Sequence, residues 1–416
     1  MELPELNPWW KEKKITEEFA PLTYRDLYQK IEKDFKRRQI QIIVGLRRVG
    51  KSTIIFQLVN HLLKKNLNPL NIFYCTFDDP DIQKKNIEEV LKDYTEITGV
   101  DYKKEKVYLF LDEVQKSKDW VSRVKLIYDN LRNIKIVISG SASLSILSES
   151  KKSLAGRSIY YELRPLSFKE FLRLKNLEAR SYLLDKEMIE KEFKNFIFRQ
   201  FPEIIAEKDI NFIKQYIRSS VIEPIILKDI PKEFGEVDIL LLENLVNIFL
   251  TKPGQYLSVD ELSRELGRAK KTLYDALFYL EFSFLTRKIL NYRPSVRAAS
   301  KKLSRVYAYH PCLTLPFQIP MENYVENLVL FELDNKYYWR EGGKEVDALD
   351  EFVPVEVKYG NDVRKGDLKS LYYYLKKYGK KLKVKKAYVV TKDLEKKEDM
   401  ICFVPLKRFC FEGLKK

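Results

Sequence analysis

The chain has 416 residues, 45% of them hydrophobic and 13% aromatic, so it is long enough for two or three folded domains. Its formal net charge is +16, with two histidines and four cysteines. So few histidines argue against Ser–His and Cys–His triads, and the cysteines form no CxxC pair for zinc or a disulfide framework. Any catalysis is therefore expected to use carboxylates, lysines and arginines.

Membrane and export signals are missing from the sequence. No apolar run reaches the ~20 residues of a membrane span. The N-terminus has neither the basic start nor the apolar stretch of a signal peptide. We therefore expect a cytoplasmic protein with no membrane partner. Abundant Lys and Glu beside scarce Cys, Met and His is also typical of a thermophile protein.

The first half of the chain alternates strands with helices. Residues 1–38 are interpreted as a lead-in with one helix over about 24–37. Apolar strands follow at 39–44, 71–77, 106–111, 134–139 and 158–163. Strands that alternate with helices favour an α/β fold with a parallel sheet. We expect this core to span 39–165 and a helical lid or linker to span 166–242.

Residues 45–52 read Gly-Leu-Arg-Arg-Val-Gly-Lys-Ser, a complete G-x-x-x-x-G-K-S loop between a strand and a helix. In that context the pattern binds the phosphates of a nucleoside triphosphate. Lys51 is expected to reach the β- and γ-phosphates, and Ser52 to bind Mg²⁺. The sequence therefore predicts a P-loop NTPase with ATP and Mg²⁺ as cofactors. The expected nucleotide contacts are Gly45, Arg48, Val49, Gly50, Lys51, Ser52, Thr53, Asp112, Ser139 and Ser141.

Two carboxylates end the buried strand at 107–113, about 60 residues after the loop. Asp112 is expected to hold Mg²⁺ through water, and Glu113 to act as the general base on the attacking water. Ser139 or Ser141, at the end of the next strand, is expected to sense the γ-phosphate. Arg157 precedes the last strand and is predicted to be an arginine finger, in cis or in trans. Its alternative is a surface cation.

Residues 243–292 have the pattern of a winged helix-turn-helix. A capping-box pattern opens a helix at Ser258, Gly267 ends it, and a second helix follows over about 269–282. The start of that second helix is where a recognition helix meets DNA. The alternative is a purely structural spacer. The residues expected to face DNA are Lys270, Lys271, Thr272 and Tyr274.

A cluster of acids lies in the last predicted domain, residues 293–416. Strand alternation projects Glu356 and Lys358 from one face, and Asp347 is expected to meet Glu356 across the strand pair. Close carboxylates repel unless a cation lies between them, so Asp347, Glu356 and Glu326 are predicted to bind Mg²⁺. Lys358 is expected to orient or deprotonate a water. The alternative is a hairpin with one wet face.

The segment 364–386 carries ten basic residues and one acid, Asp367. Four tyrosines, at 372, 373, 374 and 378, interleave with the charges. Such a segment suits phosphate backbones and base stacking, so nucleic acid, and DNA in particular, is the predicted partner. A solvated helix face is the alternative.

The order of these parts resembles AAA-type P-loop ATPases of archaea and bacteria. These join an ATPase core to a winged helix and a C-terminal α/β domain of the restriction-endonuclease-like class. The Asp…Glu-x-Lys pattern at 347–358 resembles the core of restriction-type nucleases, in which a metal activates water against a phosphodiester. The chain departs from the family at 199–203, which lacks the usual glycines, and at Tyr309-His310, where an aspartate often follows. The other matching pieces are the loop at 45–52, Leu-Asp-Glu-Val-Gln at 111–115, Ser-Gly-Ser at 139–141, Leu-Ala-Gly-Arg at 154–157 and Arg-Pro-Leu-Ser-Phe-Lys-Glu-Phe at 164–171.

The resemblance implies Mg²⁺-dependent ATP hydrolysis coupled to DNA binding or remodelling, with metal-dependent nuclease activity as a further expectation. A homo-oligomer is expected if Arg157 acts in trans. The rival interpretation is a nucleotide-gated regulatory switch whose nuclease-like domain is inert. DNA-stimulated ATP turnover separates the two, because the switch predicts slow hydrolysis that is insensitive to DNA.

Overall fold

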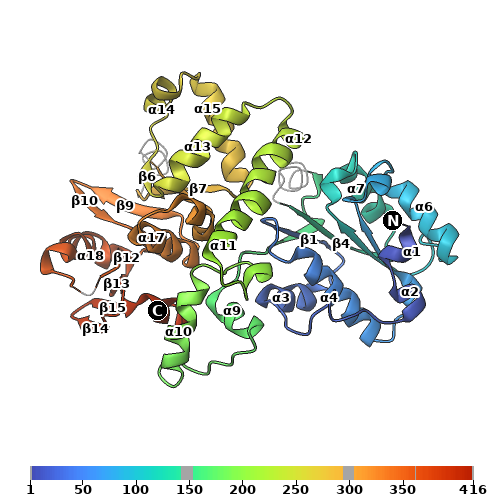
Figure 1. The fold of residues 1–416 in the computed structure, drawn as a ribbon, viewed down its shortest axis with the longest axis horizontal. Coiled ribbons are helices and arrows are strands. Elements are labelled where there is room, and N and C mark those ends of the chain that lie inside the picture. The colour runs from blue at the N-terminus through green and yellow to red at the C-terminus, as the bar shows by residue number, and fades with distance from the viewer. Residues whose placement is uncertain (1, 142–152, 294–303, 361, 415–416) are drawn as a thin grey trace. The chain divides into compact units, whose positions relative to one another are not determined.

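A computed structural model describes residues 2–141, 153–293, 304–360 and 362–414, and the chain divides into two compact units (Figure 1). The first unit is Met1–Leu166 and the second is Ser167–Lys416. Within the described ranges, no helix combines the length and the apolar character needed to cross a membrane.

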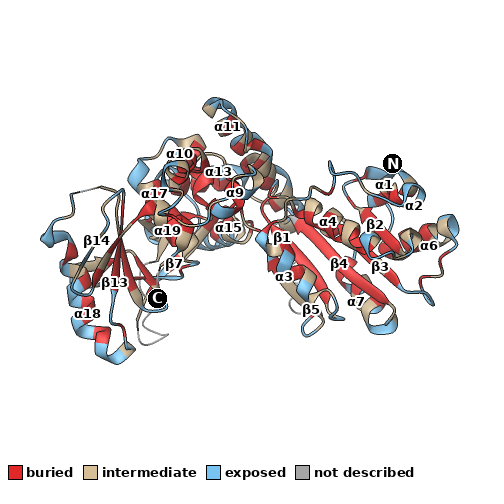
Figure 2. Ribbon diagram, turned by 90° about the horizontal axis from the view of Figure 1, so that it is seen from below, coloured by how far each residue is buried: buried red, intermediate tan, exposed pale blue. Residues whose placement is uncertain are grey.

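The first unit contains a five-stranded parallel sheet in the order β2-β3-β4-β1-β5. Its strands are largely buried because helices cover them, as Figure 2 shows. All carboxyl ends of parallel strands lie on one edge of a sheet, which is where ligands bind. The predicted α/β fold with a parallel sheet is confirmed here. The strands are β1 (Ile40–Gly45), β2 (Ile72–Thr76), β3 (Val107–Asp112), β4 (Ile134–Ser141) and β5 (Ser158–Glu162).

Helices of the first unit follow local capping signals. Asn86 and Glu89 form a reciprocal capping box at the start of α6, and Gly99 ends that helix in a left-handed conformation. The helix predicted at 24–37 is α3, which is shorter and spans Asp26–Asp34. It begins only at Asp26 because the backbone of Arg25 is extended. The helices are α1 (Leu3–Leu6), α2 (Trp9–Glu12), α3 (Asp26–Asp34), α4 (Lys51–Lys64), α5 (Pro80–Gln83), α6 (Ile87–Thr98) and α7 (Trp120–Asn130).

The predicted lead-in belongs to the first unit and covers the edge strand β2. The amide of Asn7 donates to the carbonyl of Tyr74 at 2.9 Å and accepts from its N–H at 2.8 Å. The indole N–H of the fully buried Trp9 donates to the carbonyl of Ile72 at 3.0 Å. These bonds satisfy backbone groups that an exposed edge strand would leave open to other chains.

The second unit begins with helices, as predicted for 166–242. Gly267 ends α14 with a φ of +61°, and Ser258 accepts the N–H of Glu261 at its start, although the reciprocal bond of a full capping box is not formed there. The two helices predicted at 258–266 and 269–282 are α14 and α15. The helices of this part are α9 (Phe168–Leu174), α10 (Lys186–Phe196), α11 (Ile210–Tyr216), α12 (Ile230–Phe234), α13 (Ile239–Thr251), α14 (Val259–Leu266) and α15 (Lys270–Phe282).

A mixed sheet in the order β10-β9-β7-β8-β6 follows these helices. Because β8 pairs with both β6 and β7, and β7 pairs with β9, this sheet crosses the predicted domain boundary at residue 292. Strands on both sides of that boundary therefore share one sheet. The strands are β6 (Gln255–Tyr256), β7 (Thr286–Asn291), β8 (Arg305–Ala308), β9 (Tyr337–Glu341) and β10 (Lys344–Val346).

A third sheet, in the order β11-β12-β13-β15-β14, has a parallel centre and antiparallel edges. Helix α18 (Lys369–Leu382) packs on it, and Trp339 and Tyr374 are among the fully buried side chains there. The remaining elements are α17 (Met321–Glu332), β11 (Ala348–Asp350), β12 (Val353–Lys358), β13 (Ala387–Thr391), β14 (Lys396–Glu398), β15 (Ile401–Pro405) and α19 (Leu406–Glu412).

Candidate nucleotide site and carboxylate centre

The phosphate loop connects β1 to α4 at the carboxyl edge of the first sheet. Gly45 is required because a Cβ there would lie 2.2 Å from the carbonyl oxygen of Leu163. Gly50 precedes the helix with a φ of +96°, in the left-handed region that favours glycine. Lys51 is buried and its ammonium donates to the carbonyls of Gly45, at 3.2 Å, and Leu46, at 3.0 Å. The loop carbonyls thus hold the lysine ammonium at the loop, where its charge is available to a phosphate group.

Asp112, at the end of β3, meets the loop. Its Oδ2 accepts from the hydroxyl of Ser52 at 2.6 Å and from the phenol of Tyr74 at 3.1 Å. Its Oδ1 accepts from the Ser139 hydroxyl and from the N–H of Glu113 at 3.0 Å. Burial, and then the nearby Asp112 charge, raise the pKa of Tyr74 well above its usual value, so its phenol remains a donor. Ser52 and Asp112, the two expected Mg²⁺ ligands, are therefore brought together.

Glu113 follows at the rim of the site, in a left-handed conformation with a φ of +48°. Its carboxylate accepts from the side-chain amide of Gln115 at 2.5 Å. No role was predicted for Gln115 from the sequence. Its amide holds the carboxylate that is expected to act as the base.

The two serines predicted to sense the γ-phosphate, Ser139 and Ser141, lie at different distances from the end of β4. Strand register pairs Ser139 with Ile43 and Ser141 with Gly45, the first residue of the loop. Ser139 is buried and its hydroxyl donates to Asp112, so it supports that carboxylate and does not project past the sheet edge. Ser141 is the serine at the edge, but its side chain lies outside the described residues.

Arg157 lies at the opposite edge of the sheet from the loop. The N–H of Ile40, which starts β1, donates to its carbonyl at 2.8 Å, whereas the loop follows the other end of β1. Its guanidinium forms a two-point ion pair with Asp129, at 2.8 and 3.1 Å, and this bond raises the pKa of Arg157. The finger in cis is therefore not supported by this geometry, because the sheet separates Arg157 from the phosphates of its own chain.

Arg25 is a site residue that the sequence did not reveal. Its guanidinium is buried and donates to the carbonyl of Val49, in the loop, at 2.9 Å and to that of Arg164 at 2.7 Å. Of the other predicted contacts, Arg48 is exposed with a φ of +66°, and Thr53 is half-buried. Since Arg25 comes from the lead-in, no motif spacing links it to the loop.

The features of this site fit ATP with Mg²⁺. A glycine cradle that a Cβ would fill, an ammonium inside it and a hydroxyl–carboxylate pair beside it are the donor set that triphosphate and Mg²⁺ use.

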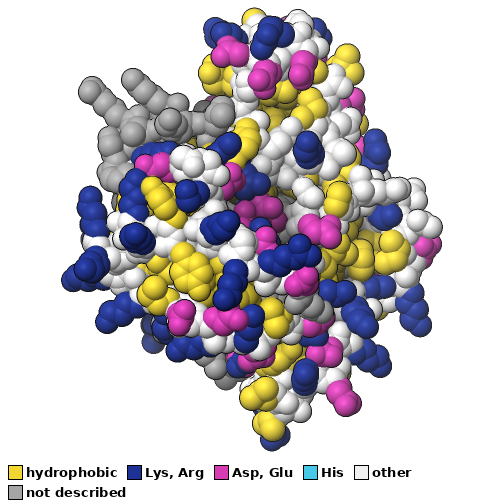
Figure 3. Space-filling view, turned by 90° about the vertical axis from the view of Figure 1, so that its left-hand side faces the viewer, with side chains coloured by type: hydrophobic (Ala, Val, Ile, Leu, Met, Phe, Trp, Pro, Cys, Tyr) yellow, Lys and Arg dark blue, Asp and Glu magenta, His cyan; other side chains and the backbone are white. Residues whose placement is uncertain are grey.

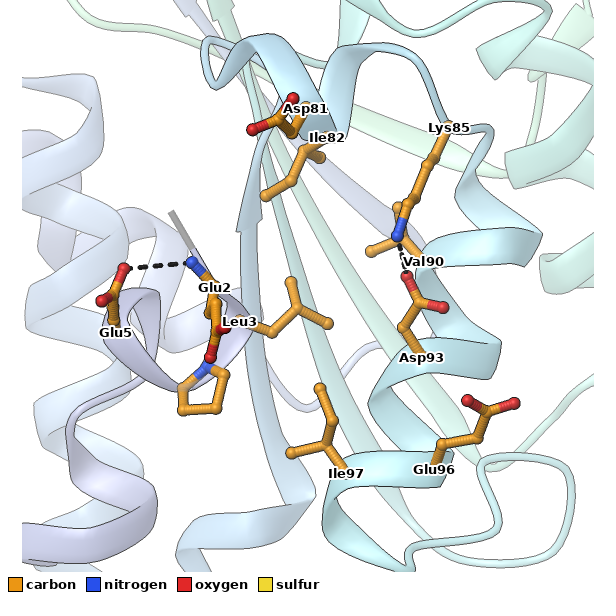
Figure 4. A pocket seen from close by; sticks show the side chains of 11 residues that line it. Glu2, Leu3, Glu5, Asp81, Ile82, Lys85, Val90, Asp93, Glu96 and Ile97 are labelled. Carbon is orange, nitrogen blue, oxygen red and sulfur yellow. Dashed lines mark hydrogen bonds and ion pairs between the residues drawn. The ribbon is translucent and has the colours of Figure 1, made fainter.

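A separate hollow in the first unit does not suit a nucleotide. It lies between the N-terminal helix and α6 (Figure 4). Its volume is about 630 Å³. Leu3, Ile82 and Ile97 give it an apolar lining, and acids surround them. Its one lysine, Lys85, is paired with Asp93 at 2.6 Å. Acids at the rim repel phosphate, so the phosphate loop remains the candidate site.

Two predicted acidic residues of the second unit, Glu326 and Asp347, and a further one, Glu345, lie around an arginine that the sequence did not reveal. The guanidinium of Arg305, on β8, lies 2.9 Å from Glu326, 3.3 Å from Glu345 and 3.8 Å from Asp347. The phenol of Tyr307 donates to the same oxygen of Glu326 at 2.6 Å. We call Arg305, Glu326, Glu345, Asp347 and Glu356 the carboxylate centre.

Glu356 and Lys358 lie at the other side of this centre. Lys358 pairs with Glu356 at 2.8 Å, and the N–H of Val357 donates to Asp347 at 2.9 Å. Both Val355 and Glu356 are buried, so β12 is covered on both faces and has no wet face at this point. Burial first, and then the charge of Glu356, raise the pKa of Asp347. Burial likewise raises the pKa of Glu356, against the effect of Lys358.

The centre does not fit Mg²⁺ in this arrangement. Within the residues that the structure describes, no three His, Cys, Asp or Glu side chains are grouped to hold a metal ion. The Arg305 guanidinium lies where the carboxylates of Glu326 and Asp347 approach each other. A cation is present at the centre, as charge repulsion predicts, but it is a side chain of the chain itself.

The structure corrects part of the prediction for nucleic-acid binding, which placed contacts on α15 and α18. On α15, Tyr274 is 59% exposed and Lys270 pairs with Asp260. On α18, Tyr374 and Tyr378 are buried, so they belong to the core and not to a stacking surface. Helical spacing explains this: they lie on the same face as the buried Leu371 and Leu375.

Three regions of the chain match protein families. Residues 37–172 match a family described as "AAA domain". Residues 191–314 and 320–409 match two domains of unknown function, DUF8612 and DUF4143. The last two matches assign no activity to the second unit.

Similar curated proteins include two from Methanocaldococcus jannaschii and one from Haemophilus influenzae. "Uncharacterized protein MJ1637" is 25% identical and covers 93% of this chain and 88% of its own length. "Uncharacterized protein MJ1544" is 28% identical, over 75% of this chain and 72% of its own length. The Haemophilus influenzae protein, also named uncharacterized, is 28% identical, over 61% and 62%.

Among solved structures, AMPPCP-bound DnaA from Aquifex aeolicus is 17% identical, with a TM-score of 0.28 over 66% of this chain and 92% of its own. A DNA replication initiation factor is 18% identical, with a TM-score of 0.27 over 67% and 98%. Scores at this level support no argument by themselves. Residues 37–172 are similar to an AAA domain, and the loop at 45–52 within them has the geometry of a phosphate-binding loop.

Proposed function

We propose that the first unit hydrolyses ATP with Mg²⁺. The observation that carries this proposal is the Ser52–Asp112 hydrogen bond of 2.6 Å beside the buried ammonium of Lys51. Bound Mg²⁺ would be held by Ser52 and Asp112 and would neutralise charge on the phosphates.

The residues of the site divide the work of hydrolysis. Lys51 attracts and orients the β- and γ-phosphates, and the loop N–H groups hold their oxygens. Tyr74 and Ser139 keep the Asp112 carboxylate in one orientation through hydrogen bonds. Glu113 accepts a proton from the attacking water, and its carboxylate has acceptor positions beyond the one that the amide of Gln115 uses.

Arg157 is proposed to act in trans, on the nucleotide of a second copy. Its position at the far edge of its own sheet supports this role over one in cis. The proposal requires a homo-oligomer and release of Arg157 from Asp129.

We further propose that the second unit binds nucleic acid, preferably DNA. Helix α15, preceded by α14 and followed by the strands β7 and β8, has the order of a winged helix-turn-helix. Exposed lysines on α18 add positive charge, and Figure 3 shows Lys and Arg side chains spread over the side of the molecule that carries α18. These surfaces would neutralise phosphates.

Metal-dependent cleavage is a second candidate function only for a state in which Arg305 has left the carboxylates. The convergence of Asp347, Glu356 and Lys358 favours it, as in a restriction-endonuclease-like fold. The presence of Arg305 among the carboxylates opposes it. The rival to both proposals for the second unit is a switch in which nucleotide alters partner contacts.

ATP turnover of the full chain, measured with and without duplex DNA, tests the proposal. We expect Mg²⁺-dependent hydrolysis that DNA accelerates, and its loss in Asp112→Asn. Slow hydrolysis that DNA leaves unchanged would instead support the switch. No hydrolysis under any of these conditions would contradict the ATPase proposal.

A further inference from the structure

Arg305 is held from several sides inside the second unit. Only 13% of its side chain is exposed, and its Nε donates to the carbonyl of Gly254 at 2.6 Å. The rings of Tyr256, Tyr307 and Tyr338 have their centroids 5.9, 5.2 and 5.9 Å from the guanidinium carbon. Carbonyl, aromatic and carboxylate contacts together fix the charge in one place.

The partners of Arg305 are fixed as well. The phenol of Tyr256 donates to Glu345, and that of Tyr307 donates to Glu326. Asp347 is held through its second oxygen by the N–H of Val357. Glu326 and Asp347 are therefore positioned in part by neutral donors, whereas Glu345 also pairs with Arg340 at 3.7 Å. The guanidinium of Arg305 lies among these carboxylates.

A divalent cation and this guanidinium need the same oxygens. Mg²⁺ requires oxygens at about 2.1 Å in octahedral geometry. The oxygens of Glu326 and Asp347 that would serve it already face Arg305, at 2.9 and 3.8 Å. A further oxygen, Oε2 of Glu356, is buried with no hydrogen-bond partner among the described residues. The centre thus keeps one buried carboxylate oxygen that no hydrogen bond uses, on the residue whose charge also acts on Asp347.

We infer that the carboxylate centre is a divalent-cation site closed by Arg305, whose guanidinium takes the place of the metal. The chain with Arg305 in this position does not bind a metal ion there. Removal of the guanidinium opens the site to a hard cation that prefers oxygen ligands. This inference is independent of the ATPase proposal, because it concerns only residues of the second unit.

Binding of Mn²⁺ to the full chain without nucleotide tests the inference. The decrease of the free Mn²⁺ signal in electron paramagnetic resonance reports binding. We expect the wild type to bind no Mn²⁺ at this centre and Arg305→Gln to gain one bound ion per chain. The gain should vanish in Arg305→Gln combined with Asp347→Asn. Arg305→Lys keeps a cation at the position and should behave as the wild type.

Two outcomes would overturn the inference. One is wild-type binding of Mn²⁺ that Asp347→Asn removes, since the site would then be open with Arg305 present. The other is a folded Arg305→Gln variant that binds no more Mn²⁺ than the wild type.

If Arg305→Gln does not fold alone, its circular dichroism is followed against Mn²⁺ concentration. Recovery of the folded signal by Mn²⁺, but not by NaCl of equal ionic strength, supports the inference. Failure of Mn²⁺ to restore the fold contradicts it, because an opened cation site would be filled and stabilised.

Discussion

The two units hold their carboxylates in different ways. In the first unit, Asp112 is surrounded by hydroxyl and backbone donors, and Lys51 donates to backbone carbonyls. In the second unit, the guanidinium of Arg305 pairs directly with Glu326 and Glu345. Hydroxyl and N–H groups orient a carboxylate and leave its net charge in place, whereas a guanidinium in an ion pair neutralises that charge. The first arrangement keeps charge for a ligand, and the second provides its own counter-ion.

The largest effect is expected from Lys51→Ala. The loop would lose the charge that meets the β- and γ-phosphates, so ATP binding should weaken by about 10³-fold, as for loss of a desolvated charge–phosphate contact worth several kcal/mol. Titration with a fluorescent ATP analogue measures this. Lys64→Ala, an exposed lysine at the far end of α4, is the matched control and should bind normally. Equal affinity in the two variants would show that the nucleotide binds elsewhere.

Glu113→Gln should separate binding from chemistry. The amide cannot accept the proton of water, so hydrolysis should slow by about 10²-fold or more while ATP affinity stays near normal. Single-turnover hydrolysis and the binding titration measure the two quantities. The control is Glu105→Gln, an exposed residue just before β3, on the opposite side of the sheet. A wild-type rate in Glu113→Gln would assign the base to another group.

Arg25→Ala should weaken ATP binding by about tenfold, because two charge-assisted bonds that position the loop are worth roughly 1.5–3 kcal/mol each and part of that cost falls on loop order. The affected carbonyls are those of Val49 and Arg164. Arg25→Lys should restore little, since an ammonium lacks the fork that spans two carbonyls. If affinity is unchanged while Tm falls, Arg25 serves only stability.

The lysines of α18 should give the smallest effect. Lys377 is paired with Glu341 at 2.6 Å, so Lys376, Lys380 and Lys381 are the better candidates for DNA phosphates. Replacing these three with Gln should flatten the slope of log K against log salt by up to about 2.7, at about 0.9 per contact. Fluorescence anisotropy with duplex DNA at several salt concentrations measures the slope. An unchanged slope would indicate that DNA does not contact these lysines and would favour α15 as the DNA-binding helix.

Local patterns predicted the first site better than the second. The residues Gly45 to Ser52 and the strand end at Asp112 carry their roles in short motifs, because backbone geometry fixes the position of residues at the end of a strand. Arg25, Tyr74 and Arg305 come from distant segments, and no spacing connects them to the residues they hold. Arg305 was missed for a further reason: it lies on β8, a strand that was not predicted from the sequence.

Two other corrections, to Arg157 and to the tyrosines of α18, could have been predicted from the sequence pattern. Arg157 precedes a strand parallel to β1, so strand direction alone places it opposite the loop. Tyr374 and Tyr378 follow the helical spacing of a buried face, but the charge of their neighbours favoured a surface interpretation. The strand and the helix were both predicted. What was not predicted is the end of the strand at which Arg157 lies and the face of the helix that is buried.

The number of Mn²⁺ ions bound per chain, measured with and without a non-hydrolysable ATP analogue, tests the contrast between the units most directly. We predict one ion with nucleotide, lost in Lys51→Ala, and none without it, because Arg305 closes the second site. One ion without nucleotide and two with it, the extra ion disappearing in Asp347→Asn, would contradict this account.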